Sequence, residues 1–165
     1  MVRGRKNPAH HRLPLRLRQA RRRLGLTPAG TSLASGLSNE AVTQIERRQR
    51  LPRIGTIEQL AACLHVSAAW LAFGEGNAER DSSAMGCDHV GQRIAELRQA
   101  QGMTRKALGI ASQLAGQAIA NIEQKGMLPR VDALERIAKA LGVPPGWLAF
   151  GAGHATAEQR PQHCA

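Results

Sequence analysis

The chain carries one stretch of sequence twice. Residues 13–76 align with residues 90–153 at a constant offset of 77 positions, without a gap, and 23 of the 64 aligned positions are identical. The densest run of identities is Trp-Leu-Ala-Phe-Gly, at 70–74 and again at 147–151. Self-similarity at a fixed spacing indicates a duplicated structural unit. Each repeat is near the lower size limit for a domain that folds without metals or disulfides, so the sequence predicts two small domains.

The repeats divide the chain into five segments. We expect a basic disordered arm at 1–12, domain 1 at 13–76, a linker at 77–89, domain 2 at 90–153 and a disordered tail at 154–165. Two interpretations of the arm stay open: a solvated tail, or a segment that lies along a DNA backbone or in a minor groove. The linker is rich in Ser, Ala, Gly and acidic residues, and a flexible chain of that length typically spans roughly 20 Å.

Charge distinguishes the two repeats. The net charge is +11, of which residues 1–76 carry +9, residues 77–89 carry −2 and residues 90–165 carry +4. Such strong basicity indicates nucleic acid or an anionic membrane surface as the partner. The aromatic residues are one Trp and one Phe at equivalent places in each repeat, where we expect them in the core. No other aromatic side chain is available to stack on unpaired bases, which argues against a single-strand binder.

The cysteines and the hydropathy indicate a cytoplasmic protein. Cys63, Cys87 and Cys164 have no shared spacing, so we expect reduced thiols rather than a disulfide framework. The sequence has no run of 18 apolar residues that would cross a membrane. The basic first twelve residues lack the apolar core of a secretory signal.

Few residues have the pattern of a metal or catalytic site. The pairs His10-His11 and His163-Cys164 and the segment 87–89 contain metal-ligand types, but they lie in the predicted tails and linker. Zinc sites of the knuckle type need paired cysteines two to four residues apart, and the sequence has none. It also lacks a glycine-rich phosphate loop and a nucleophile with a recognisable base. We expect no metal, no cofactor and no enzymatic activity.

Apolar spacing and helix-ending residues predict five short helices and no strand in each repeat. In repeat 1 the expected helices span 13–24, 28–36, 39–48, 54–64 and 68–73. In repeat 2 they span 90–101, 105–112, 116–125, 131–141 and 145–150. The predicted fold class is therefore all-α.

The second and third helices of repeat 1 form a recognisable pair. Thr27 is expected to cap the second helix, with Pro28 in its first position, and Ser38 is expected to cap the third. Between them, Gly36 suits a left-handed turn. Two capped helices joined by a short turn that contains glycine form the helix-turn-helix arrangement.

This pattern closely resembles the lambda-repressor/Cro-type (XRE-like) helix-turn-helix family. In repeat 1 the matching residues are Leu26-Thr27, Gly36-Leu37-Ser38, Val42, Ile45-Glu46-Arg47 and Pro52. In repeat 2 they are Met103-Thr104, Leu108, Ile119, Ile122-Glu123, Pro129 and the run from Arg136 to Val143. The resemblance implies two tandem five-helix DNA-binding domains. It also implies that Glu46 and Glu123 support the fold by pairing with Arg21 and Arg98 of the first helices.

In this family the third helix lies in the major groove and its first residues contact base edges. By position, the base-reading candidates of repeat 1 are Ser38, Asn39, Glu40, Thr43 and Gln44. The amides fit this role because Asn or Gln bonds an adenine edge in two places, whereas Glu40 would accept from cytosine or repel phosphate. The phosphate-binding candidates are Arg47, Arg48, Arg50 and Arg53, for which the alternative is a solvated basic face.

Repeat 2 has a less polar candidate surface. Its base-reading candidates are Gln117 and Asn121, and its basic candidates are Lys125 and Arg130. Both repeats depart from the family pattern. Gln113 occupies the place of Gly36, Gly116 weakens the start of the third helix, and Thr31-Ser32 replaces the usual Leu-Ala pair. We expect the last substitution to loosen the core of domain 1.

The sequence therefore predicts a sequence-specific regulator of double-stranded DNA, most simply a repressor, of the prokaryotic, phage or plasmid type and located at the nucleoid. Tethered domains on neighbouring half-sites would raise the apparent affinity. In a second hypothesis, domain 1 alone binds DNA and domain 2 is a dimerisation or partner-binding module, including an antitoxin-type regulator. A homodimer, and a binder that recognises only DNA shape, stay open as further alternatives.

Overall fold

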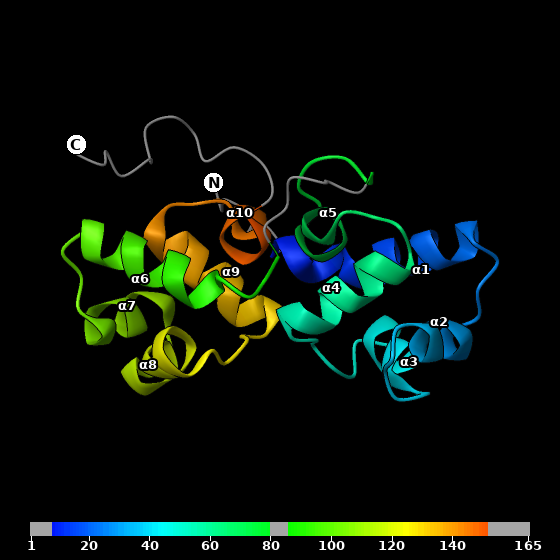
Figure 1. Ribbon diagram of the computed structural model, residues 1–165, viewed down its shortest axis with the longest axis horizontal. Coiled ribbons are helices and arrows are strands. Elements are labelled where there is room, and N and C mark those ends of the chain that lie inside the picture. Colours follow the sequence, from blue (N-terminus) through cyan, green and yellow to red (C-terminus); the bar gives the residue numbers. More distant parts are fainter. Residues whose placement is uncertain (1–7, 80–85, 152–165) are drawn as a thin grey trace, which may run out of the picture.

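The computed structural model describes residues 8–79 and 86–151, which form two five-helix units (Figure 1). Unit 1 contains α1 (Leu13–Arg23), α2 (Pro28–Ala34), α3 (Ala41–Glu46), α4 (Ile54–Cys63) and α5 (Ala68–Phe73). Unit 2 contains α6 (Val90–Ala100), α7 (Arg105–Ser112), α8 (Gly116–Lys125), α9 (Val131–Leu141) and α10 (Pro145–Phe150). The all-α prediction is confirmed, and every helix ends within two residues of its expected limits. The expected tail, residues 1–7 of the arm and residues 80–85 of the linker lie outside the described residues.

Side-chain caps explain where several helices begin. Thr27 at α2 and Thr104 at α7 each accept a hydrogen bond at 3.0 Å from the backbone N–H three residues on. Ser67 does the same at α5, at 3.3 Å. Each cap satisfies one of the backbone donors that a helix leaves unpaired at its start. The predicted cap at Thr27 is confirmed.

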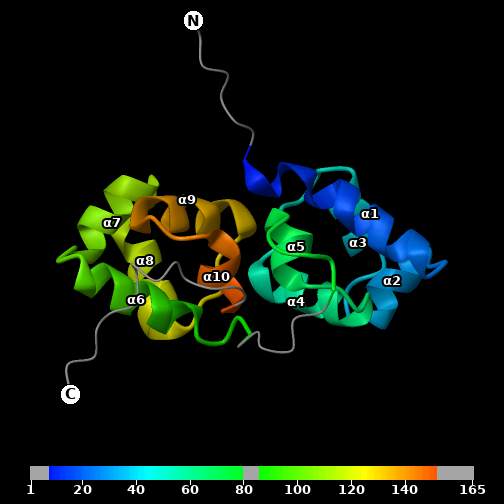
Figure 2. The ribbon, with the colours of Figure 1, turned by 90° about the horizontal axis from the view of Figure 1, so that it is seen from above.

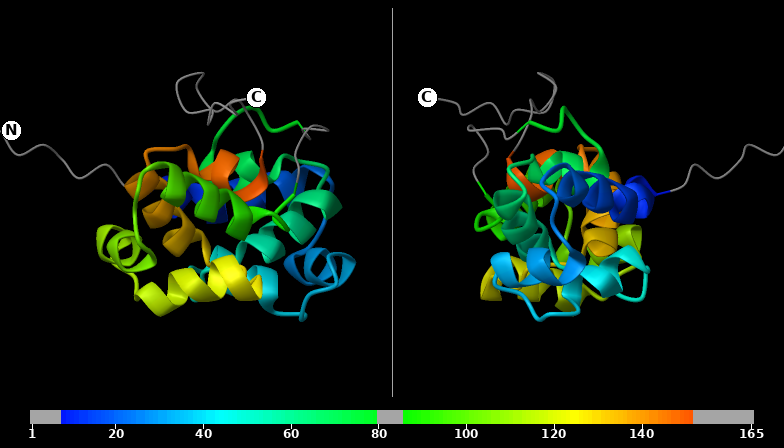
Figure 3. Two further views of the ribbon diagram at one scale, coloured as in Figure 1. Left: turned by 60° about the vertical axis from the view of Figure 1, so that its left-hand side comes forward. Right: turned by 90° about the vertical axis from the view of Figure 1, so that its right-hand side faces the viewer.

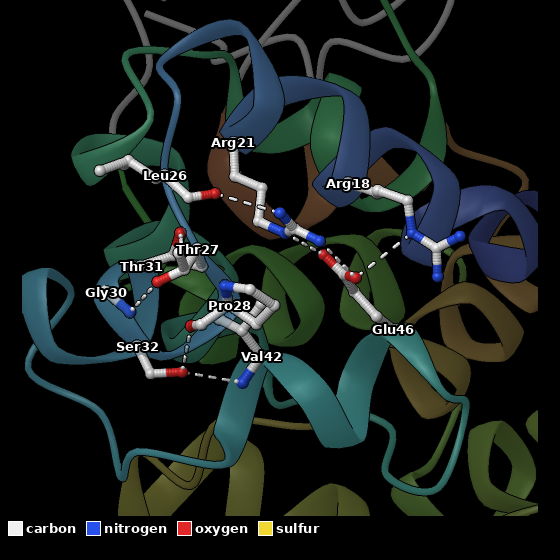
Figure 4. Close-up of polar contacts among 10 residues, drawn as sticks. All are labelled: Arg18, Arg21, Leu26, Thr27, Pro28, Gly30, Thr31, Ser32, Val42 and Glu46. Carbon is white, nitrogen blue, oxygen red and sulfur yellow. Dashed lines mark hydrogen bonds and ion pairs between the residues drawn. The ribbon is translucent and has the colours of Figure 1, made fainter.

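The start of α3 differs from the prediction. The helix begins at Ala41, two residues later than expected, and Ser38 does not cap it. Instead, the Ser32 hydroxyl on α2 accepts a hydrogen bond from Val42 N–H at 3.1 Å and donates one to the Pro28 carbonyl at 3.0 Å (Figure 4). A neighbouring helix therefore supplies the cap. The side chains of Thr31 and Ser32 are fully buried with their hydroxyls bonded, so this pair joins α2 to α3 where we expected it to loosen the core.

Unit 2 closes the same turn with glycine. A Cβ at Gly109 would lie 2.8 Å from the Leu114 carbonyl oxygen and 2.9 Å from the Gly116 nitrogen, so α7 and α8 approach each other closely. A Cβ at Gly116 would lie 3.3 Å from Lys106 Cα. Gln113 takes a left-handed φ of 56° in the turn. Gln113 and Gly116, the departures expected to weaken repeat 2, therefore lie at a tight contact between two helices. The helix that follows is not shortened, since α8 has ten residues where α3 has six.

The buried apolar side chains of both units form one connected cluster. Equivalent positions contribute fully buried residues to it, including Leu17 and Ile94, Ile57 and Leu134, and Leu71 and Leu148. Phe73 and Phe150 are buried as expected, whereas Trp70 and Trp147 are half-buried and pack against the cluster. The core therefore continues from one unit into the other.

The units pack through the same surface on each. Helix α5 lies against α10 between them (Figures 1 and 2). Ile54 N–H donates to the Pro129 carbonyl at 3.0 Å, and Val131 N–H donates to the Pro52 carbonyl at 3.1 Å. Since these residues correspond at an offset of 77, the two hydrogen bonds are equivalent, and the units are related locally by a two-fold axis.

A second pair of equivalent contacts joins the fourth helix of each unit to the start of the other. The Glu135 carboxylate on α9 accepts from Ala9 N–H at 2.6 Å and lies 2.5 Å from His10 Nδ1. The Glu58 carboxylate on α4 accepts from Cys87 N–H at 3.2 Å and from its thiol at 2.8 Å. Residues Ala9–Arg12 form a 3-10 turn, so the last part of the expected disordered arm is ordered. Burial, followed by Glu58, raises the pKa of Cys87 to about 12.

The contact that Glu75 makes with unit 2 has no described counterpart. The Glu75 carboxylate accepts a hydrogen bond from Gly146 N–H at 2.8 Å, at the start of α10. Burial is the main cause of a raised pKa for Glu75. The position equivalent to Glu75 is Ala152, outside the described residues.

Candidate nucleic-acid interface

The third helices of the two units lie on one face of the molecule. Both α3 and α8 lie along the lower edge in Figure 1, and both views in Figure 3 keep them on the same side. Helices α5 and α10 lie on the opposite side. The two-fold axis between the units therefore passes through this face and carries α3 onto α8.

An ion pair ties α3 to α1. Arg21 Nε donates to Glu46 Oε1 at 2.5 Å and Arg21 Nη2 donates to Oε2 at 3.0 Å, while Arg18 Nε adds a third bond at 3.3 Å (Figure 4). Burial raises the pKa of Glu46, but the bonds and charges of Arg21 and then Arg18 outweigh burial, so the net pKa is lowered. The expected pairing of Arg21 with Glu46 is confirmed.

Unit 2 repeats this ion pair between α6 and α8. Arg98 Nε donates to Glu123 Oε1 at 2.7 Å, and Arg105 Nε on α7 donates to Oε2 at 2.7 Å. Burial opposes the ionised form of Glu123, but its bonds from Arg98 and Arg105 lower the net pKa. The second expected pairing is also confirmed. Both third helices are therefore fixed to their scaffolds at the carboxyl-terminal end.

A buried arginine joins the first helix of each unit to the last helix of that unit. The sequence did not predict this role. Arg16 Nε donates to the Leu71 carbonyl at 2.9 Å and Nη2 donates to the Ala72 carbonyl at 2.6 Å. Arg93 makes the same bonds to the equivalent carbonyls of α10, at 2.8 and 2.5 Å. Burial, followed by the charge of Arg12, lowers the pKa of Arg16 to about 10, so it remains charged at neutral pH. The available signal was an arginine identical in both repeats.

The base-reading candidates of unit 1 surround the start of α3. Ser38, Asn39 and Glu40 are exposed in the turn that precedes the helix, and Thr43 and Gln44 are half-buried on its first turns. Gln44 Nε2 lies 3.5 Å from Glu40 Oε2. The structure therefore brings all five candidates together at one end of α3.

The arginines expected to contact phosphates follow the end of α3. Arg47, Arg48 and Arg50 are exposed. Arg48 has a left-handed φ of 60°, and its Nη1 lies 3.3 Å from His11 Nε2. Arg53 is exposed as well, but its Nη1 donates to the Leu128 carbonyl of unit 2 at 2.6 Å. Arg53 thus also contributes to the junction of the units, a role that its sequence context did not predict.

A polar groove joins α3 to this junction. Arg50, Arg53 and Arg130 line it together with Ser38 and other residues. Arg53 and Arg130 oppose each other as an isolated antiparallel bridge at the two-fold axis. Three guanidinium groups on one groove make a surface suited to phosphate oxygens.

Unit 2 presents a smaller set of polar groups. Gln117 is exposed and Asn121 half-exposed on α8, and Gln117 Nε2 donates to Asn121 Oδ1 at 3.1 Å. These two positions correspond to Glu40 and Gln44 of unit 1. Lys125 is exposed at the end of α8, and Arg130 lies beyond it at the junction.

Across residues 8–79 and 86–151, no group of three or more His, Cys, Asp or Glu side chains is placed to hold a metal ion. Among the helices of these same segments, none has both the length and the apolar character needed to cross a membrane.

Comparison with known proteins identifies the repeats. The family model described as "Helix-turn-helix" matches the chain twice, at residues 17–71 and 94–148. No curated protein and no solved structure matches the chain significantly. The two matched segments run from α1 into α5 and from α6 into α10, and together they cover more than half of the chain. The chain therefore belongs to the lambda-repressor/Cro-type (XRE-like) helix-turn-helix family of DNA-binding transcription regulators, in two tandem copies.

Proposed function

We propose that this protein is a sequence-specific repressor that reads the major groove of double-stranded DNA with α3. The observation that carries the proposal is the arrangement of exposed polar and basic side chains at the two ends of α3. Ser38, Asn39 and Glu40 are exposed where base edges would lie, and Arg47 and Arg50 are exposed where phosphates would lie. A repressor needs no further activity, because a protein that occupies a promoter blocks the polymerase by occlusion.

The roles divide by chemistry. Asn39 and Gln44 supply amides for adenine, and Glu40 accepts from the amino group of cytosine. Arg48 and Arg53, like Arg47 and Arg50, supply charge without sequence information. The proposed location is the cytoplasm, at the nucleoid.

A salt titration of duplex binding tests these roles. Each arginine that neutralises a phosphate contributes roughly 0.9 to the slope of log affinity against log salt concentration. Arg47→Gln and Arg50→Gln should therefore each lower the slope by about 1 without changing the preferred sequence. Arg22→Gln on α1, an exposed arginine outside the candidate surface, is the matched control. Equal affinity for every duplex sequence at about 0.15 M salt would contradict the proposal and favour a binder of DNA shape.

The second candidate function assigns DNA to unit 1 alone and makes unit 2 a dimerisation or partner-binding module, including an antitoxin-type regulator. The observation in its favour is that the end of α8 and the segment after it carry two exposed basic residues, Lys125 and Arg130, where the segment after α3 carries four. Under this alternative, Gln117→Ala combined with Asn121→Ala leaves affinity for DNA unchanged. A large loss of affinity would reject it.

A further inference from the structure

We propose that one chain, acting as a single molecule, reads one asymmetric duplex site whose two halves differ in sequence. Unit 1 reads one half and unit 2 reads the other. This inference rests on the proposed function, and it specifies the kind of DNA site that the chain binds. Proteins of this architecture that pair as identical subunits require a site with two matching halves, because site symmetry mirrors protein symmetry.

The first step is the self-complementary interface. Pro52 and Pro129 each accept from the other unit, and Glu58 and Glu135 each bind the start of the other unit. These residues are identical at equivalent positions of the two repeats. Such an isologous interface uses the same patch on both partners and is complete once two patches have met. Because both patches belong to one chain, the pairing is satisfied within the molecule, and residues 8–79 and 86–151 leave neither patch open to a second chain.

The second step is the direction of the reading helices. The same two-fold axis that pairs the units places α3 and α8 on one face (Figures 1 and 3). Two inverted half-sites about one helical turn apart, 34–36 Å, call for that arrangement of helices. The groove lined by Arg50, Arg53 and Arg130 runs from α3 to the junction of the units, where the centre of such a site would pass.

The third step is the difference between the reading surfaces. Asn39, Glu40, Thr43 and Gln44 of unit 1 correspond to Gly116, Gln117, Ala120 and Asn121 of unit 2. None of these four positions is identical. Glu40 is suited to cytosine, whereas its counterpart Gln117 is suited to adenine and Ala120 to the methyl group of thymine. The pairing axis therefore joins two surfaces that select different bases.

The two halves of the site also differ in the number of basic residues that would contact their phosphates. Unit 1 follows α3 with Arg47, Arg48 and Arg50, and the equivalent residues of unit 2 are Gln124, Lys125 and Met127. The half-site read by unit 1 therefore receives more phosphate contacts and depends more strongly on salt.

Selection of bound sequences from random duplex DNA with the full chain is the first test. We expect one enriched site with two unlike halves, and mass measurement of the saturated complex should give one chain per duplex. Enrichment of a palindrome, or two chains on each duplex, would overturn the inference while leaving sequence-specific binding intact. No enrichment of any sequence would instead reject the proposed function itself, and the inference with it.

Half-site exchange then assigns each unit. Scrambling either half of the enriched site should lower the affinity of the native chain at least about tenfold, since each wrong base pair costs about 1–3 kcal/mol. Gln44→Ala should reduce the penalty for scrambling one half only, and Asn121→Ala should reduce it for the other half only. These residues correspond in the two units, so each variant is the control for the other. If both variants became less sensitive to the sequence of the same half, two units would not be reading separate halves. The same conclusion would follow if scrambling the unit 2 half cost the native chain no affinity.

Discussion

Units 1 and 2 share the contacts that anchor their first and third helices and the main contacts that pair them, and they differ most in the residues exposed around the third helices. The buried arginines Arg16 and Arg93 bond equivalent carbonyls, and both Arg–Glu pairs tie a third helix to a first helix. By contrast, the surface around α3 carries Asn, Glu, Thr and Gln where α8 carries Gly, Gln, Ala and Asn. Duplication has therefore kept the fold and the pairing surface while the exposed surface changed.

The two units also form the connection between their second and third helices in different ways. Unit 1 joins α2 to α3 with the Ser32 hydroxyl, and unit 2 brings α7 against α8 through Gly109. Ser32 and Gly109 are equivalent positions. A shared fold therefore does not require shared local contacts, and substitutions at equivalent positions distinguish common interactions from those of one unit.

The largest expected effect tests whether the buried arginines are equivalent. Arg16→Met and Arg93→Met each leave two helix carbonyls without their donors inside the protein. Because a bond to a charged group contributes about 1.5–3 kcal/mol, each variant should lose about 3 kcal/mol of unfolding free energy in urea titration. The exposed Arg22→Met should change it by less than about 0.5 kcal/mol. If only one of the two variants showed a small loss of unfolding free energy, the two buried arginines would not be equivalent.

The next effect concerns the two buried carboxylates. Glu46→Gln and Glu123→Gln should each lower the unfolding free energy by about 2 kcal/mol at neutral pH, because each removes a charged partner of two arginines. The folded-state pKa values of both glutamates are lowered from 4.5. Their contribution is therefore complete above that value and is lost as the pH falls through the folded-state pKa.

Urea titrations from pH 7 to pH 3 check the direction of this pH dependence of stability. The native chain should lose stability steeply below about pH 4.5, and each glutamine variant should show a flatter curve because one of the two groups no longer titrates. A variant with the steep native curve would show that its glutamate does not contribute.

Equivalent alanine substitutions in the turn should have unequal effects. Gly109→Ala places a Cβ within 3 Å of backbone atoms of Leu114 and Gly116, and overpacking of this kind costs about 2 kcal/mol. Ser32→Ala creates no clash but removes the acceptor of Val42 N–H, which costs about 1 kcal/mol. Unfolding titrations should rank the variants in this order, and amide exchange at Val42 should accelerate only in Ser32→Ala. The reverse ranking would mean that the tight contact of α7 with α8 can relax.

Helix positions followed from the sequence because local signals fix them. Thr27 caps α2 as predicted, and α8 has its expected limits. The start of α3 did not follow, because its cap comes from Ser32 on another helix and that contact exists only after folding. Local patterns do not show which side chains meet in three dimensions.

The composition of the candidate reading surface was predictable, but its packing against the rest of the molecule was not. Gln44 and Asn121 were predicted from their place in the family pattern, and the helices that carry them, α3 and α8, lie on one face of the molecule. The pairing of the units was missed, although the repeated Leu-Pro-Arg segments and Glu58 with Glu135 are identical. Identity between repeats has two physical causes, a shared core and a shared interface, and a one-dimensional alignment cannot separate them.

The smallest expected effect concerns two positions where one unit has glycine and the other does not. Gln113 has a φ of 56° where unit 1 has Gly36, and His65 has a φ of 54° where unit 2 has Gly142. Since a left-handed conformation costs a non-glycine residue about 1 kcal/mol, Gln113→Gly and His65→Gly should each stabilise the chain by about 0.5 kcal/mol after the added entropy of the unfolded glycine is counted.

Thermal unfolding checks these two variants, with Gly36→Ala and Gly142→Ala as controls that should destabilise by about 1 kcal/mol. Gln113→Gly keeps the hydrogen bond that Arg136 donates to the carbonyl of residue 113, because this acceptor belongs to the backbone. A loss of stability in Gln113→Gly would therefore assign a role to the glutamine side chain itself. The difference between the two turns would then reflect a contact specific to unit 2 rather than a backbone conformation that both units share.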